Sequence, residues 1–96
     1  MSTVMVTYRV KPDQVDRNLE LLRAVHAEIQ AVRPEGLRYA SFQLADGVTF
    51  VELVEGGGQG RLAGMEAFRA YRSTLDERIE APPVLEELDE IGSYGF

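Results

Sequence analysis

The chain of 96 residues contains no cysteine and no tryptophan, and it has a single histidine, His26. Without cysteine the protein cannot form disulfides, thiol nucleophiles, iron–sulfur clusters or cysteine-based zinc sites. A lone histidine and the lack of calcium-loop spacing among the acidic residues argue against a metal site of any kind. A cysteine-free chain also fits a reducing compartment, so we predict a cytoplasmic location.

Positive charge is scarce as well. Ten Lys and Arg stand against sixteen Asp and Glu, which gives a net charge of −6, and the only lysine is Lys11. Surfaces that bind nucleic acid or anionic lipid need clustered cations, whereas these arginines are scattered. No apolar run approaches the ~18 residues of a membrane span, and residues 1–10 lack the basic and apolar regions of a signal peptide. We expect no nucleic acid and no membrane as partners, and one soluble domain over residues 1–96.

Strand-like and helical patterns alternate along the chain. β-Branched and aromatic residues predict strands, an apolar repeat of three and four residues predicts helices, and an Asp-Gly pair predicts a hairpin turn at 45–47. The predicted strands are 4–10, 37–44, 48–54 and 89–94, and the predicted helices are 14–32 and 65–80. The glycine-rich segment 56–60 lacks the spacing of a nucleotide-binding loop and is predicted as a flexible connection, with a turn at 84–88.

This order of elements predicts an α+β, ferredoxin-like βαββαβ fold, with two helices on one face of a four-stranded antiparallel sheet. Alternation along the first and third strands places Tyr8 and Glu52 on the helix face. It places Met5, Val51 and Leu53 on the other face, which is then too apolar to be left in water. We therefore expect a homodimer in which two sheets face each other, with a monomer as the alternative. In the second strand, Tyr39, Ser41 and Gln43 are expected to lie toward the dimer face.

The layout resembles the dimeric α/β-barrel superfamily, and within it the antibiotic-biosynthesis-monooxygenase-like proteins. The residues that carry the resemblance are 5–12, 36–39, Phe42, 46–51 and 91–94. It implies facing sheets in a dimer, a pocket between sheet and helices, and chemistry that needs no cofactor. Two branches of the superfamily use a tryptophan near the pocket, and the haem-degrading branch takes an axial histidine from its second helix. This chain has no tryptophan, and its histidine lies in the first helix, so no catalytic residue is carried over.

Five polar residues fall on or beside the apolar faces and form the candidate site. His26 lies on the stripe of the first helix and Arg72 on the stripe Met65–Phe68–Arg72–Leu75–Ile79 of the second. We interpret His26 as a general base and Arg72 as a group that binds a carboxylate or enolate oxygen. Tyr8, Glu52 and Asn18, the last at the edge of the first helical stripe, are predicted to bind ligand. Tyr71 lies about 70° off the second stripe and is expected to be a packing or surface residue.

The same residues have a structural explanation. His26 can be a satisfied core histidine, and Arg72 can pair with Glu52 or extend into solvent. The four serines, Ser2, Ser41, Ser73 and Ser93, have no nucleophile-elbow context. Two functions follow: a homodimeric, cofactor-independent monooxygenase or binder of a small apolar or aromatic molecule, and a non-enzymatic dimer with a packed interior. An open cavity of about 300 Å³ or more beside His26 and Arg72 distinguishes them.

Overall fold

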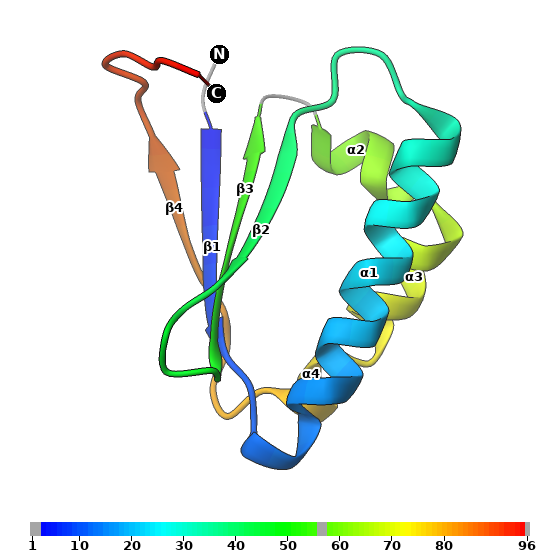
Figure 1. Ribbon diagram of the computed structural model, residues 1–96, viewed down its shortest axis with the longest axis vertical. Coiled ribbons are helices and arrows are strands. Elements are labelled where there is room, and N and C mark those ends of the chain that lie inside the picture. Colours follow the sequence, from blue (N-terminus) through cyan, green and yellow to red (C-terminus); the bar gives the residue numbers. More distant parts are fainter. Residues whose placement is uncertain (1–2, 56–57, 96) are drawn as a thin grey trace.

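The computed structural model describes residues 3–55 and 58–95, which form one antiparallel sheet with helices on one of its faces (Figure 1). The sheet has the order β2-β3-β1-β4. Its strands are β1 (Thr3–Arg9), β2 (Tyr39–Gln43), β3 (Thr49–Glu55) and β4 (Val84–Leu88). The helices are the 3-10 turn η1 (Pro12–Gln14), α1 (Val15–Val32), α2 (Gly58–Ala63), α3 (Glu66–Ser73) and α4 (Leu75–Arg78). The predicted α+β, ferredoxin-like fold is confirmed.

The core lies between the sheet and the helices. From β1 and β3, Val6, Tyr8, Phe50 and Val54 are buried, as the alternation of these strands predicted. Helix α1 contributes Asn18, Leu21, Leu22 and Val25. The predicted stripe of α1 was centred too far round the helix, because Val15, Leu19 and Ile29 only pack against the edge of this core. Among the described residues, no helix is long and apolar enough to cross a membrane.

The predicted helix 65–80 is divided into α3 and α4 at Thr74. The hydroxyls of Ser73 and Thr74 both donate to the carbonyl of Ala70, at 3.2 and 3.1 Å. Such side-chain bonds compete with the helical ladder, and Thr74 adopts a non-helical φ of −111°. The division changes which residues face the sheet. The predicted stripe was right at Met65, Leu75 and Ile79, which are buried. It was wrong at Arg72, which is exposed, whereas Tyr71 and Arg78 are buried.

The other differences lie at the two glycine- and proline-rich connections. The predicted flexible segment 56–60 is helical from Gly58, where α2 begins, and its first two residues lie outside the described part of the chain. The last strand is Val84–Leu88, where a turn was predicted, and not 89–94. The strand could not be recognised from the sequence, because β4 is a largely exposed edge strand. Burial therefore imposes no alternation of apolar and polar residues on it.

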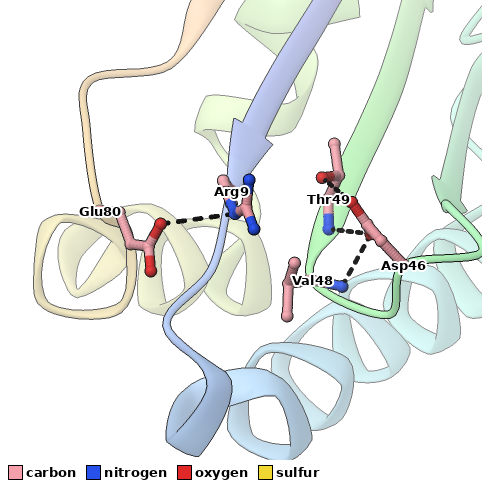
Figure 2. Close-up of polar contacts among 5 residues, drawn as sticks. All are labelled: Arg9, Asp46, Val48, Thr49 and Glu80. Carbon is pink, nitrogen blue, oxygen red and sulfur yellow. Dashed lines mark hydrogen bonds and ion pairs between the residues drawn. The ribbon is translucent and has the colours of Figure 1, made fainter.

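The hairpin between β2 and β3 fixes the register of the edge strand β2. The predicted turn at 45–47 is confirmed: Asp46 accepts bonds from the amides of Val48 and Thr49 and from the Thr49 hydroxyl, at 3.0, 2.9 and 2.6 Å (Figure 2). These donors hold the pKa of Asp46 below its usual value. Gly47 takes the left-handed φ of 78° that glycine tolerates best.

The resulting register pairs Tyr39 with Val54, Ser41 with Glu52 and Gln43 with Phe50. Residues that are directly opposite in a ladder share a face, so these side chains lie on the helix face of the sheet. The prediction that Tyr39, Ser41 and Gln43 point toward a dimer face was therefore wrong. The large side chain on the open face of β2 is Phe42, which is paired with Val51 and is 45% exposed.

The end of α4 is tied to the end of β1. Arg9 reaches Glu80 with its Nε atom 3.4 Å from a carboxylate oxygen, an exposed ion pair that contributes little by itself (Figure 2). Backbone bonds are more important here: the Glu80 amide donates to Arg9 O at 3.0 Å and the Lys11 amide to Arg78 O at 2.8 Å. These bonds place Arg78 beside the helix face of the sheet.

Candidate functional site

A row of polar side chains crosses the otherwise apolar layer between sheet and helices. Arg78 Nε donates to Asn18 Oδ1 at 3.0 Å, and Asn18 Nδ2 donates to Tyr8 Oη at 3.1 Å. The hydroxyl oxygens of Tyr8 and Tyr71 lie 2.6 Å apart, and Tyr71 Oη donates to Glu52 Oε2 at 2.5 Å. All five residues are buried and come from five different elements: β1, β3, α1, α3 and α4.

The chemistry of its ends gives this row one direction. The guanidinium of Arg78 can only donate, so Asn18 must present its oxygen to Arg78 and its amide nitrogen to Tyr8. Tyr8 then accepts a hydrogen bond from Asn18, and its own hydroxyl can donate a hydrogen bond to Tyr71. Because Tyr71 accepts that bond, its own hydroxyl proton is available for a hydrogen bond to Glu52. The hydrogen bonds of this row therefore all point from Arg78 toward the carboxylate. Glu52 accepts a hydrogen bond from Tyr71, which is itself bonded by Tyr8.

Burial dominates the protonation of this row. Desolvation raises the pKa of Glu52 to about 7, although the bond from Tyr71 and the charge of Arg72 oppose the shift. Burial and then the Glu52 charge raise the pKa of Tyr8 to about 12, and the same two causes raise the pKa of Tyr71 further. Near neutral pH the tyrosines stay protonated, and Glu52 is the group that exchanges a proton.

Glu52 also lines a cavity of about 330 Å³ between the sheet and helices α2 and α3. Its walls are mainly apolar and include Val6, Val54, Leu62, Phe68 and Leu85. Two exposed arginines one turn apart on α3, Arg69 and Arg72, also line it, and neither forms an ion pair within the described residues. Tyr39 completes the lining; its buried hydroxyl has no hydrogen-bond partner in the part of the chain that is described. A polar group of that kind is available to a ligand.

His26 lies elsewhere. Its Nε2 is 2.9 Å from Ser41 Oγ, and its ring stacks on Tyr39 with 5.0 Å between ring centroids. Both His26 and Ser41 line a second cavity, of about 370 Å³, beside the edge strand β2. A third hollow of about 510 Å³ near the C-terminal segment contains Arg38, but that arginine is already bonded to Glu55 at 2.7 Å. That ion pair leaves the Arg38 guanidinium less available to a ligand than the arginines of the Glu52 cavity.

The structure thus divides the residues predicted from the sequence. Tyr8 and Glu52 lie close together as expected, and Asn18 joins them as a buried residue rather than at the edge of its helical stripe. Of these three predicted ligand-binding residues, Glu52 alone is among the residues that line the cavity. His26 and Arg72 do not join them in a single His–Arg–Glu–Tyr cluster. His26 is half-buried at the second cavity, because the core stripe of α1 passes through Asn18, Leu22 and Val25 instead. Arg72 is exposed at the mouth of the Glu52 cavity, because the break at Thr74 frees α3 to bury Tyr71.

Two central residues, Tyr71 and Arg78, were missed from the sequence. Tyr71 was expected to be a packing or surface residue, and Arg78 carried no expectation. The spacing Phe68, Tyr71, Leu75 and Arg78, of three, four and three residues, was a signal for them. A buried arginine is too rare for that spacing to outweigh the competing stripe through Met65 and Ile79. Within the described residues, no group of three or more acidic or histidine side chains is placed to hold a metal ion.

Comparisons with known proteins agree on the fold. No family model and no curated protein matches the sequence. Solved structures do match: a structure of an antibiotic biosynthesis monooxygenase is 19% identical, with a TM-score of 0.74, covering 96% of this chain and 100% of that one. Rv0793 from Mycobacterium tuberculosis is 21% identical, with a TM-score of 0.75 and coverage of 96% of both chains.

A third match has a described activity. SnoaB, a cofactor-independent oxygenase from Streptomyces nogalater, is 11% identical with a TM-score of 0.68, covering 99% of this chain and 97% of that one. Identities at this level establish common architecture and leave chemistry to the site itself. The predicted resemblance is confirmed at the level of the fold: this chain has the fold of the antibiotic-biosynthesis-monooxygenase-like proteins.

Proposed function

We propose that the protein binds a small hydroxylated aromatic molecule in the Glu52 cavity and oxygenates it without a cofactor. The observation that carries this proposal is the cavity itself: apolar walls around one buried carboxylate whose pKa is raised to about 7. A site of that kind accepts an aromatic ring and removes a phenolic proton. The open volume favours a ligand-binding protein over a non-enzymatic dimer with a packed interior.

The reaction proceeds in two stages. Ionised Glu52 takes the phenolic proton, for which a base of pKa near 7 is better matched than an ordinary glutamate. The electron-rich phenolate then reacts with molecular oxygen at a ring carbon. For 1-naphthol, one O₂ gives 1,4-naphthoquinone and one water, so substrate electrons reduce the second oxygen atom and no external reductant is needed. Tyr8 and Asn18 hold Tyr71 against Glu52, and Arg72 at the mouth faces the anion.

Oxygen uptake tests this proposal. We expect 1-naphthol to be consumed with equal amounts of O₂ and to give 1,4-naphthoquinone, in protein freed of metals and flavins. Ala63→Trp should abolish binding and uptake, because Ala63 is an exposed residue of α2 that lines the cavity and an indole there fills it. Ala70→Trp, exposed on α3 away from the cavity lining, is the matched control. Equal activity in both variants would place the reaction outside this cavity.

The two arginines at the mouth, Arg69 and Arg72, predict a preference among ligands. A carboxylate on the ligand can form a bidentate bond with Arg72. We expect 1-hydroxy-2-naphthoate to bind about tenfold more tightly than 1-naphthol, and Arg72→Gln to remove that advantage without changing 1-naphthol binding. Titration calorimetry at two salt concentrations measures both effects. An advantage that persists in Arg72→Gln excludes this role for Arg72.

We propose that the working form is a homodimer. The sheet face opposite the helices is uncovered (Figure 1), and it presents Met5, Val51, Leu53 and Phe42. An apolar face of this kind is typical of an interface. Native mass spectrometry should show a dimer, Val51→Lys should give a monomer, and Ala27→Lys, on the exposed side of α1, should leave the dimer intact. A monomeric native protein excludes the proposal. A single domain and a cytoplasmic location stay predictions.

A further inference from the structure

The second cavity holds a pair of residues that the proposed oxygenation does not use. Ser41 Oγ lies 2.9 Å from His26 Nε2, which is hydrogen-bonding distance. The pair joins the edge strand β2 to α1, and both side chains are only partly buried and line the same cavity of about 370 Å³. A hydroxyl bonded to an imidazole at the wall of an open cavity is the arrangement that nucleophilic catalysis requires.

His26 is in the state and orientation of a base. Burial lowers the pKa of its imidazole from the usual value, which favours the neutral ring. With its proton on Nδ1, Nε2 accepts the Ser41 proton. The ring is stacked at an interplanar angle of 19° on Tyr39, which in turn packs edge-on against Phe68. This stacking fixes the plane of the imidazole, which in many hydrolases is the task of a carboxylate.

The remainder of the cavity suits an acyl ester. Leu19, Leu22 and Phe50 provide apolar contact for an acyl chain or an aromatic leaving group. Arg23, one turn before His26 on α1, also lines the cavity and forms no ion pair within the described residues. A guanidinium there can bind the oxygen that becomes negative when a carbonyl carbon is attacked.

We propose that Ser41 and His26 form a nucleophile–base pair that accepts acyl groups from small, apolar esters. The site is separate from the Glu52 cavity, and the proposal does not depend on the oxygenation. Ser41 Oγ forms a bond to the carbonyl carbon while its proton passes to His26 Nε2. The bond to the leaving alkoxide or phenoxide then breaks, and that group takes the proton from His26. Water repeats the sequence on the acyl-serine, releasing the carboxylic acid and restoring Ser41.

The experiment uses p-nitrophenyl acetate with the whole protein near pH 7.5. We expect a burst of p-nitrophenol approaching one per chain, together with an acetyl group that peptide mapping locates on Ser41. Ser41→Ala should abolish the burst. His26→Gln, which keeps a hydrogen-bonding group beside Ser41, should slow it at least about a hundredfold. Ser93→Ala removes an exposed hydroxyl that does not line this cavity and should leave the burst unchanged.

Peptide mapping of the acetylated native protein tests whether Ser41 is the nucleophile before any variant is made. Acetyl groups confined to Lys11 or the terminal amine, or a burst that persists in Ser41→Ala, overturn the proposal and leave the His26–Ser41 bond as a tie between α1 and β2. Far-ultraviolet circular dichroism of each variant confirms that it has folded. Oxygen uptake on 1-naphthol is expected to be equal in Ser41→Ala and native protein, because Ser41 does not line the Glu52 cavity.

Discussion

Replacement of Arg78 by methionine is expected to lower the free energy of unfolding by about 3 kcal/mol. Arg78 is 2% exposed and donates to Asn18 Oδ1, Thr74 Oγ1 and Tyr71 O at 3.0, 2.5 and 2.8 Å. Its guanidinium also lies 5.4 Å from the centre of the Tyr71 ring. Methionine fills similar space but leaves the Asn18 and Tyr71 oxygens buried without donors, and each such group costs on the order of 1–3 kcal/mol.

One effect acts in the opposite direction. The acceptors that Arg78 bonds within residues 3–55 and 58–95 are neutral, and removal of a desolvated charge recovers part of the cost of burying it. We expect the lost donors to outweigh this gain because three bonds to a charged group disappear at once. Arg78→Lys separates the two effects: it keeps the charge but cannot reach three acceptors that are arranged for a planar fork. It should therefore be destabilised by about 2 kcal/mol or more.

Urea denaturation followed by circular dichroism measures these differences. Arg17→Met is the control, because Arg17 is an exposed residue paired with Glu20 at the surface. This change should alter the free energy of unfolding by less than about 0.5 kcal/mol. If Arg78→Met is as stable as Arg17→Met, the polar row is not a determinant of stability. A native-like Arg78→Met with weakened 1-naphthol oxidation would still indicate that Arg78 positions Asn18 and, through it, Tyr8.

The sequence predicted the layers of this fold because burial imposes a period on each element that is covered on one side. Tyr8 and Glu52 were placed correctly, since they lie on central strands whose neighbours alternate strictly. The edge strands β2 and β4 are covered less, so their alternation is weak, and the face of Ser41 and the position of β4 were both mistaken. Prediction is therefore weakest where the His26–Ser41 cavity lies.

The candidate site could be predicted only in part, for a related reason. Glu52 is conspicuous because a carboxylate interrupts an apolar strand face. Tyr71 and Arg78 are not, because a rotation of about 100° around the helix axis decides whether Arg72 or Tyr71 faces the sheet. That rotation depends on the hydroxyls of Ser73 and Thr74 bonding back to Ala70, a local choice that periodicity does not encode. Tyr71, the hydrogen-bond partner of the Glu52 carboxylate, can thus be identified only when the orientation of the helices is known.

Glu52 is expected to make the stability of the protein fall as the pH rises from about 4.5 to about 7. Its folded pKa, about 7, lies above the ordinary value of 4.5. Between these two values the folded protein holds a proton that the unfolded chain has released, so each step up in pH favours unfolding. The stabilising effect is complete below pH 4.5 and is lost as the pH passes 7. Its full size is about 3 kcal/mol, since one pKa unit corresponds to about 1.4 kcal/mol.

Glu52→Gln isolates this effect from the other titrating groups. Glutamine can still accept the Tyr71 hydroxyl but carries no charge at any pH, and the remaining carboxylates and His26 are common to both proteins. The free energy of unfolding of Glu52→Gln minus that of the native protein should therefore rise by about 3 kcal/mol between pH 4.5 and pH 8. Urea denaturation at five or six pH values measures the difference. A constant difference across that range would falsify the raised pKa.

The same variant separates the electrostatics from the chemistry. If Glu52 is the base, Glu52→Gln should oxidise 1-naphthol at least about a hundredfold more slowly at pH 8, while binding it as well as before. In the native protein, turnover should rise through pH 7 as the carboxylate ionises, and the same change in protonation lowers stability over that interval. A rising stability difference combined with undiminished turnover means that Glu52 is a buried acid without a catalytic role. A rising stability difference combined with lost turnover means that the charge which destabilises the fold is the charge that removes the proton.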